Sequence, residues 1–367
     1  MRIYCDRQAL AEAVNNVQRA VASKSALPAL EGILLRSSAS SLFLAGYDME
    51  LGITTTIEAQ VDEPGEIVLT AKLFSEILRR LPADEVLIES NDKNNTIIRC
   101  GNSEFTIMGF SSVDYPELPT INNGAAMTMQ QNMLKSMIRQ TLFAVAQTDT
   151  RPVHTGVQFE IKDQVLRLVA VDGSRLAMRS EPIKSNEDLQ FVVPGKTLNE
   201  VLKLLGDEEE PLYVTVGARH IIMEIGGYSV FSRLLDGEFL PYRKAIPINA
   251  STKIRVNTRA MIDAVDRASL VINDRLKSPL ICRFKDDRIS LSCITALGSA
   301  NDTVEAKIDG RQEEMGFNSR FLLDALRNTE SDEIVIELSG TQSPMKILPA
   351  EGESFLFLVL PVRLKRV

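Results

Sequence analysis

Three stretches of the chain combine a helical spacing of apolar residues with one order of charges on the opposite side. In the first stretch, 71–81, Lys72, Glu76 and Arg79 stand at i, i+4 and i+7. Successive residues of a helix rotate by about 100°, so these three fall within one sector. The apolar positions that fall on the other side are Phe74, Ile77, Leu78 and Leu81. The pattern predicts a helix with an apolar back and a front that is basic, acidic and basic.

The same pattern returns twice, each time 124 residues later. The charged positions become Lys196, Glu200 and Lys203, and then Arg320, Asp324 and Arg327. The apolar positions become Leu198, Val201, Leu202 and Leu205, and then Leu322, Ala325, Leu326 and Thr329. Self-similarity at a fixed period indicates a repeated structural unit. The chain of 367 residues therefore contains three copies of one unit.

Each copy has the same predicted order of elements. A first amphipathic helix is expected over 7–21, 131–145 and 258–271, with Asp6 and Asn257 as N-caps of two of them. Alternating apolar runs predict about eight strands per copy; those of the first copy include 29–36, 41–45, 51–59, 83–90, 96–100 and 104–108. Short turns between such runs favour antiparallel sheets with one buried face. The expected fold is α+β, with domains 1–122, 123–249 and 250–367 divided at turn-rich stretches.

Charge is distributed unevenly between the predicted helices and the rest of the chain. The net charge is −8, which argues against nucleic-acid binding by the molecule as a whole. The six predicted helices nevertheless carry +7, which leaves −15 on the remainder. Such a molecule can repel polyanions over most of its surface and attract them at one face.

Cysteine usage and hydropathy indicate a soluble protein of a reducing compartment. Cys5, Cys100, Cys282 and Cys293 lie far apart in sequence and are expected to be buried thiols. The N-terminus has no signal-peptide core, and the longest apolar run, 355–362, is too short to span a bilayer. We expect a cytoplasmic protein.

A linear array of repeats leaves unpaired ends unless it is capped or closed. The outer strand of the first copy carries Phe105 and Ile107 in an alternating apolar run, and such an edge aggregates unless it is covered. Because the first and third copies differ, a head-to-tail contact between two chains could close a ring. We therefore expect a homodimer whose helices collect positive charge around a central hole.

Four segments give the chain a resemblance to a known family. They are VAVDGSRLA (169–177), GEFLPYRKAIP (237–247), GFNSRFLLDAL (316–326) and FLVLPVRL (357–364). Together with the three-copy layout, they resemble the bacterial sliding clamps, the beta subunits of DNA polymerase III. The resemblance covers essentially the whole chain. It implies the DNA clamp fold and a ring-shaped homodimer that encircles duplex DNA and tethers the polymerase, without a cofactor, a metal or catalytic activity of its own.

A sliding ring must hold DNA through its phosphates rather than through its bases. The candidates for this contact are Lys24, Lys72, Arg79, Lys135, Arg139, Lys196 and Lys203. Lys24 is included because it matches a basic loop position of the family. A solvated surface cation is an equally good interpretation of any one of them. Taken as a group, they favour contact with DNA.

The resemblance also implies a pocket between the second and third copies that takes short peptide tails from polymerases, the clamp loader and repair factors. Its expected residues are His154, Val171, Gly173, Ser174, Arg175, Leu176, Leu240, Pro241, Lys244, Ala245, Leu276, Asn318, Phe321, Gln342, Pro344, Leu358, Leu360, Pro361, Val362, Arg363 and Leu364. His154 stands where an aliphatic residue is expected in some relatives. A preformed apolar surface that takes two or three anchors costs an extended peptide little ordering. The alternative for 358–364 is a terminal strand in the core, but Pro361 cannot donate to a central ladder.

Two features set this chain apart from the family pattern. Ser174 stands where other residues are common, and Lys365, Arg366 and Val367 extend the chain past Leu364. At the ring joint we expect Leu270 and Val271 to meet Phe105 and Ile107, mainly by apolar burial. The edge 295–302 offers one acid, so strong charge pairing is not expected there.

Enzymatic motifs are incomplete in this sequence. Residues 194–197 end like a phosphate-binding loop, but Gln190 occupies the position of its first glycine. Ser343 and Lys346 match SxxK without the companion motifs of that class of hydrolase. A scaffold that binds peptides but not DNA remains the alternative function. It would have no reason to concentrate +7 on its helices.

Overall fold

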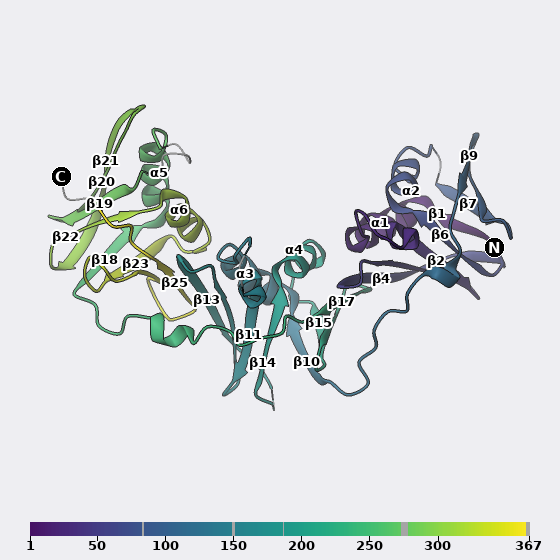
Figure 1. Ribbon diagram of the computed structural model, residues 1–367, viewed down its shortest axis with the longest axis horizontal. Helices are drawn as coiled ribbons and strands as arrows, with labels where there is room; N and C mark the ends of the chain where they lie inside the picture. The colour runs from purple at the N-terminus through teal and green to yellow at the C-terminus, as the bar shows by residue number, and fades with distance from the viewer. Residues whose placement is uncertain (83, 149–150, 186, 273–277, 365–367) are drawn as a thin grey trace. The chain divides into compact units, whose positions relative to one another are not determined.

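The computed structural model describes the chain except for residues 83, 149–150, 186, 273–277 and 365–367. The chain forms two compact units, Met1–Leu134 with Asn199–Leu234 and Lys135–Leu198 with Leu235–Val367. The middle copy contributes strands to both units, and these strands can be followed by their colour along the chain in Figure 1. No helix in the described residues is both long and apolar enough to cross a membrane.

The first unit contains two antiparallel sheets. One has the order β5-β1-β7-β8-β9 and the other β10-β15-β16-β17-β4-β3-β2-β6. The strands of the first sheet are β1 (Arg2–Asp6), β5 (Gln60–Glu63), β7 (Glu85–Ser90), β8 (Asn95–Cys100) and β9 (Ser103–Met108). The second contains β2 (Gly32–Ser38), β3 (Ser41–Tyr47), β4 (Leu51–Glu58), β6 (Gly65–Thr70), β10 (Ala125–Gln130), β15 (Pro211–Val216), β16 (His220–Ile225) and β17 (Tyr228–Arg233). Strands of the first and second copies thus share one sheet.

The second unit contains one long sheet of order β14-β11-β12-β13-β25-β24-β23-β18-β21-β20-β19-β22. Its second-copy strands are β11 (Gly156–Lys162), β12 (Val165–Val171), β13 (Arg175–Pro182) and β14 (Leu189–Pro194). Its third-copy strands are β18 (Thr252–Asn257), β19 (Leu280–Lys285), β20 (Arg288–Thr295), β21 (Gly298–Gly310), β22 (Glu313–Phe317), β23 (Glu333–Leu338), β24 (Met345–Pro349) and β25 (Phe355–Val359). The second and third copies therefore join through β13 and β25.

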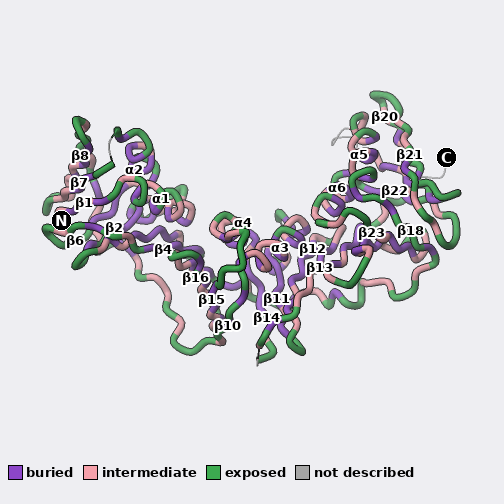
Figure 2. Tube along the Cα trace, turned by 180° about the vertical axis from the view of Figure 1, so that it is seen from behind, coloured by how far each residue is buried: buried purple, intermediate pink, exposed green. Residues whose placement is uncertain are grey.

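Two helices per copy lie where the sequence predicted them. They are α1 (Arg7–Val17), α2 (Ala71–Leu78), α3 (Gln131–Leu142), α4 (Gly195–Leu204), α5 (Thr258–Ser269) and α6 (Ser319–Arg327). Asp6 and Asn257 cap α1 and α5, accepting from the N–H groups of Ala9 at 2.8 Å and Ala260 at 2.9 Å. The predicted apolar faces of α2, α4 and α6 are buried, except that Leu202 is half-buried. Figure 2 shows the buried residues running along the strands and the inner sides of the helices.

One strand boundary was wrong. The strand predicted over 29–36 begins only at Gly32, because Pro28–Glu31 form a turn of 3-10 helix. Proline suits the first turn of a helix, since its φ is already helical and the missing N–H would have no partner there. The four cysteines are free thiols in buried positions, as predicted, and burial raises the pKa of Cys5 and of Cys282 to about 12.

Candidate functional sites

A tight turn between β12 and β13 organises the candidate peptide site in the second unit. The Asp172 carboxylate accepts from the backbone N–H groups of Ser174 at 3.0 Å and Arg175 at 3.1 Å. Gly173 has a φ of 83°, a left-handed conformation that costs glycine little. The local sequence Asp-Gly-Ser therefore builds the turn by itself, and it places the Ser174 carbonyl just before the start of β13.

Beneath this turn lies a buried apolar cluster. Leu176 on β13 is the direct cross-strand neighbour of Leu358 on β25, and both are buried. The remaining buried members are Val153, Val169, Val171, Val192, Phe239 and Tyr242. Leu240 packs against the cluster from the segment that leads to the third copy. Among the predicted pocket residues, Val171, Leu176, Leu240 and Leu358 therefore lie together.

The segment 237–247 is fastened to the second-copy part of the sheet. The Tyr242 hydroxyl donates to Glu160 Oε2 at 2.7 Å, and Arg243 forms an ion pair with the same carboxylate. Burial, followed by the hydrogen bond to Glu160, raises the pKa of Tyr242 to about 12. Pro241, Lys244 and Ala245, also predicted for the pocket, are exposed along this segment.

Sequence reasoning missed Phe239 and Tyr242 as cluster members, although the repeat marks both positions. Counting back 124 residues gives Tyr115 and Leu118, which belong to an apolar cluster of the same construction in the first unit. A comparison of the repeats beyond the helices would have found both residues.

The end of the chain crosses this site as a short strap, residues 360–364. β25 stops at Val359, and the Leu360 N–H donates to the Ser174 carbonyl at 2.9 Å. The Val362 N–H donates to the Gly316 carbonyl on β22 at 2.8 Å. Leu364 lies close over Gly316, where a Cβ would come within 2.6 Å of its side chain. Residues 357–359 thus belong to a buried central strand between β13 and β24, whereas the chain leaves the ladder before Pro361, and Leu360 and Val362 remain 41% and 40% exposed.

The other predicted pocket residues have different surroundings. Asn318 caps α6, its side chain accepting from the Arg320 N–H at 3.0 Å, and it is exposed. Gln342 is exposed and Pro344 half-buried just before β24. The His154 ring meets that of Phe239 edge-on at 5.8 Å. Arg363 is exposed, while Leu276 falls outside the described residues.

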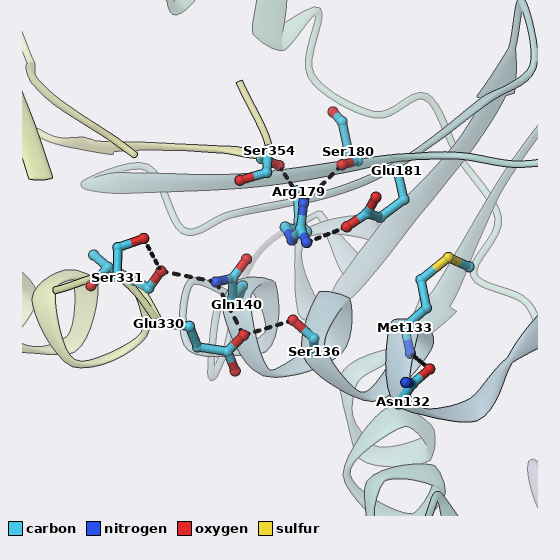
Figure 3. A network of polar contacts seen from close by, with 11 residues as sticks. Asn132, Met133, Ser136, Gln140, Arg179, Ser180, Glu181, Glu330, Ser331 and Ser354 are labelled. Atoms are coloured by element: carbon cyan, nitrogen blue, oxygen red, sulfur yellow. Dashed lines mark hydrogen bonds and ion pairs between the residues drawn. The ribbon is translucent and has the colours of Figure 1, made fainter. Parts of the chain in front are cut away.

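Polar contacts hold the second copy to the third within this unit (Figure 3). On α3, the Ser136 hydroxyl donates to Glu330 at 2.7 Å, and the Gln140 amide donates to the Thr329 carbonyl at 3.2 Å. Arg179 on β13 donates to the Ser354 carbonyl at 3.0 Å. The candidate peptide site therefore lies on a joint with a defined geometry.

The predicted DNA-facing cations differ in exposure and in pairing. Lys24, Lys72, Arg79 and Arg139 are exposed and form no ion pair within the described part of the chain. Lys203 is paired with Glu200 at 2.8 Å. Lys196 is exposed and Lys135 half-buried.

The charged front of the third copy departs from the repeat. Arg327 is held by Asp266 at 2.7 Å, and Asp324 turns to Arg175 at 2.5 Å. The predicted order of basic, acidic and basic charges is thus present in the sequence, but in the structure its acid and one of its bases bind other elements. Arg320 is exposed.

The predicted dimer residues lie at two sheet edges, each in its own unit. β9 is the last strand of its sheet, with Phe105 38% exposed and Ile107 half-buried. β21 pairs β20 over 298–305 and β18 only over 306–310. Leu270, directly after α5, is 82% exposed, and the Val271 carbonyl accepts from Thr295 Oγ1 at 2.8 Å.

Asp302, the one acid of 295–302, is already engaged. Arg267 Nε donates to Asp302 at 2.7 Å, and this hydrogen bond holds the pKa of the carboxyl below its usual range. Glu305, a second acid in the open stretch 298–305, is exposed, and Ile294 and Leu297 are exposed beside this edge.

Comparisons with known proteins match the whole chain. Three family models of the DNA polymerase III beta subunit fit in sequence order: the N-terminal domain over residues 1–119, the central domain over 128–241 and the C-terminal domain over 243–363. The beta sliding clamp of Halalkalibacterium halodurans is 35% identical over 99% of this chain and 100% of its own length.

Solved structures give the same result. The DNA polymerase sliding clamp of Bacillus subtilis superposes with a TM-score of 0.96 at 32% identity and covers 100% of both chains. A putative DNA polymerase III beta subunit of Eubacterium rectale superposes with a TM-score of 0.95 at 35% identity, over 99% of each chain. The chain belongs to the DNA polymerase III beta subunit family, the family of the beta sliding clamps.

Proposed function

We propose that two copies of this chain close into a ring that encircles duplex DNA, slides along it and tethers the replicative polymerase. The clamp loader and repair factors would use the same peptide site, and the ring itself would catalyse no reaction. It would act in the cytoplasm. Membership of the sliding-clamp family supports this function, and the pairing of strands between repeats carries the argument for a ring.

The second and third repeats each end in a strand that pairs with a strand of the preceding repeat. β17 of the second copy pairs with β4 of the first, and β25 of the third pairs with β13 of the second. By the same rule, β9 of the first copy should pair with the 298–305 part of β21. Both of these edges lack such a partner within the described chain. Two chains that exchange this contact head to tail complete every joint, and a closed ring follows.

The side chains at these edges suit such a joint. Phe105 and Ile107 on β9 would meet Leu270 and Val271 beside β21. Burying exposed apolar area contributes roughly 25 cal/mol per Å² to association. Asp302 is already paired with Arg267, so this acid would add little charge pairing between chains, and the joint would rest mainly on apolar burial and strand pairing.

Electrostatic contact with DNA would come from basic side chains of the helices. Lys72 and Arg79 lie four and three residues from Glu76 on α2, and both side chains are exposed and without an ion pair in the described structure. Free cations can replace counterions on phosphate oxygens without reading the sequence. Lys24, Lys135, Arg139, Lys196 and Lys203 would add to this contact.

A closed ring can be tested by topology. The dimer is loaded on a nicked circle and on the same DNA after linearisation, and retention is measured at rising salt. A ring remains on the circle and slides from the free ends of the linear molecule. Equal loss from both forms would refute encirclement and would favour a peptide-binding scaffold that does not surround DNA.

A further inference from the structure

Arg175 is an enclosed cation at the centre of the candidate peptide site. Its side chain is only 10% exposed. Nε donates to Asp172 at 2.9 Å, and Nη1 donates to Asp324 on α6 at 2.5 Å. The guanidinium also lies over the Phe321 ring at 4.5 Å and near the Phe143 ring at 5.6 Å. Two carboxylates and two rings therefore surround it.

These partners belong to different elements of the site. Asp172 shapes the turn whose Ser174 carbonyl accepts from Leu360. Phe321 and Asp324 belong to the third-copy helix α6. Phe143 follows α3 and packs edge-on against Phe357 of β25 at 5.2 Å. One side chain thus fixes the turn, the helix and the strand that leads into the strap.

The first copy supplies an internal control, because it builds the same turn without an arginine. Asp48 accepts from the N–H groups of Glu50 at 3.0 Å and Leu51 at 2.7 Å, and Met49 has a φ of 77°. The residue 124 positions before Arg175 is Leu51, which is buried. Neither the turn nor the strand joint therefore requires the arginine.

The helix partners of Arg175 are equally specific to the third copy. Phe321 and Asp324 correspond to Thr197 and Glu200 in the second copy. Glu200 is paired with Lys203 of its own helix. The arrangement of Arg175, Asp324 and Phe321 occurs at the joint that carries the C-terminal strap. This location points to a role in the function of the strap.

We propose that Arg175 is a positioning residue of the peptide site. It holds the 172–175 turn and the strap 360–364 in place against α6 before a peptide arrives, so that the apolar anchors enter a prepared surface. Preorganisation of this kind increases affinity because the ordering cost does not fall on the binding step. This inference rests on the proposed function, since it concerns the same peptide site.

A direct contact between Arg175 and an acidic peptide group fits the geometry less well. Nε and Nη1 already bind carboxylates, and Phe321 covers one face of the guanidinium. The two roles differ in their dependence on Asp324. A contact residue would keep binding peptide after Asp324 is neutralised, whereas a positioning residue would lose its hold on the turn.

The test measures anisotropy of a fluorescent peptide copied from the clamp-binding tail of a replicative polymerase, with the full-length dimer. R175A and D324A should each raise the Kd about tenfold, and the double variant should raise it no further, since both remove the same constraint. R175K should recover part of the affinity. R36A, which removes the exposed Arg36–Glu66 pair of the first unit, should leave the Kd unchanged. Thermal melting and solution mass confirm that each variant is folded and dimeric.

Three results would overturn the positioning role: a normal Kd for R175A, a normal Kd for D324A beside a weakened R175A, or additive losses in the double variant. If an alanine variant does not fold, R175K and D324N are compared in the same cycle. Failure of the unmodified dimer to bind the peptide would remove the proposed peptide site itself, and it would be seen before any variant is measured.

Discussion

The joint between the first and second copies and the joint between the second and third copies share a backbone design but differ in their side chains. In the first, Gly52 on β4 faces Phe231 on β17. In the second, Leu176 on β13 faces Leu358 on β25. The aspartate-stabilised turn precedes both joints, followed by the buried Leu51 in one and by Arg175 in the other.

The difference shows how a duplicated joint can be specialised. In the first joint, Leu118 packs near Gly52, where an added Cβ would lie 2.7 Å from its Cδ2 atom. Beyond β17 the chain continues towards the next repeat. In the second joint β25 leads into the strap, where Leu360 and Val362 are half-exposed. Strand pairing is therefore the common element, and the side chains decide whether a joint can also bind a partner.

The largest expected effect concerns the third joint, which a single chain cannot make. F105D places a charge on the apolar edge of β9, and burying it without a partner is costly. The Kd of the dimer should rise about 100-fold or more, as measured by sedimentation over a dilution series. V113D alters a side chain that is 89% exposed and lies outside β9, so it should remain dimeric. A fully dimeric F105D at nanomolar concentration would contradict the proposed joint.

The second prediction separates the peptide site from the joint beneath it. A chain that ends after Val359 lacks the strap and its hydrogen bonds to Ser174 and Gly316. We expect its affinity for the polymerase tail to fall about 100-fold by anisotropy, while light scattering still reports a dimer. A chain that ends after Leu364 keeps the strap and should bind normally. Normal binding by the shorter chain would show that the peptide site lies elsewhere.

The third prediction compares free and paired cations on equivalent helices. K72A/R79A removes two unpaired charges and should weaken binding to a short duplex roughly tenfold at low salt, with a salt slope that is smaller by about 2. R327A removes a charge that Asp266 already neutralises, so its effect should be smaller. Fluorescence titrations at several salt concentrations measure both quantities. Equal losses of DNA affinity would mean that the Arg327–Asp266 ion pair does not distinguish the two helices.

The smallest expected effect concerns a charge cluster near the second joint. Lys346 binds Glu337 at 2.6 Å and donates to the Pro247 carbonyl at 3.2 Å, and Lys253 binds the same carboxylate at 3.0 Å. Burial alone would raise the pKa of Glu337, but the hydrogen bonds from Lys346 and Lys253 outweigh it and lower the pKa below 4.5.

A lowered pKa means that Glu337 stabilises the fold above about pH 4.5 and that this contribution is lost as the pH falls through the depressed value. E337Q should cost about 1 kcal/mol at neutral pH by urea denaturation and should flatten the acid limb of the stability profile. An unchanged acid limb would show that this carboxyl is not linked to unfolding. E333Q alters an exposed pair with Arg255 and serves as the control.

Much of the fold could be predicted because the repeat is regular. The helix faces were confirmed down to single residues such as Phe74 and Leu322, since apolar spacing alone determines which side of a helix is buried. The strand boundary at 29–36 failed because a proline turn and a buried strand show the same run of apolar residues. The peptide-site residues came from family resemblance and the DNA-contact cations mainly from the charge on the predicted helices, and both sets stay predictions.

By itself, the sequence determined the threefold repeat, the helices and the N-caps of two of them. These features depend on local spacing and on the chemistry of single residues. Only the tertiary structure decided that Asp324 turns from its own helix front to Arg175, and that the second copy divides its strands between two sheets. The physical reason is that an ion pair or an edge strand takes whichever partner folding brings within reach, and residues 149 positions apart show no such proximity in a linear sequence.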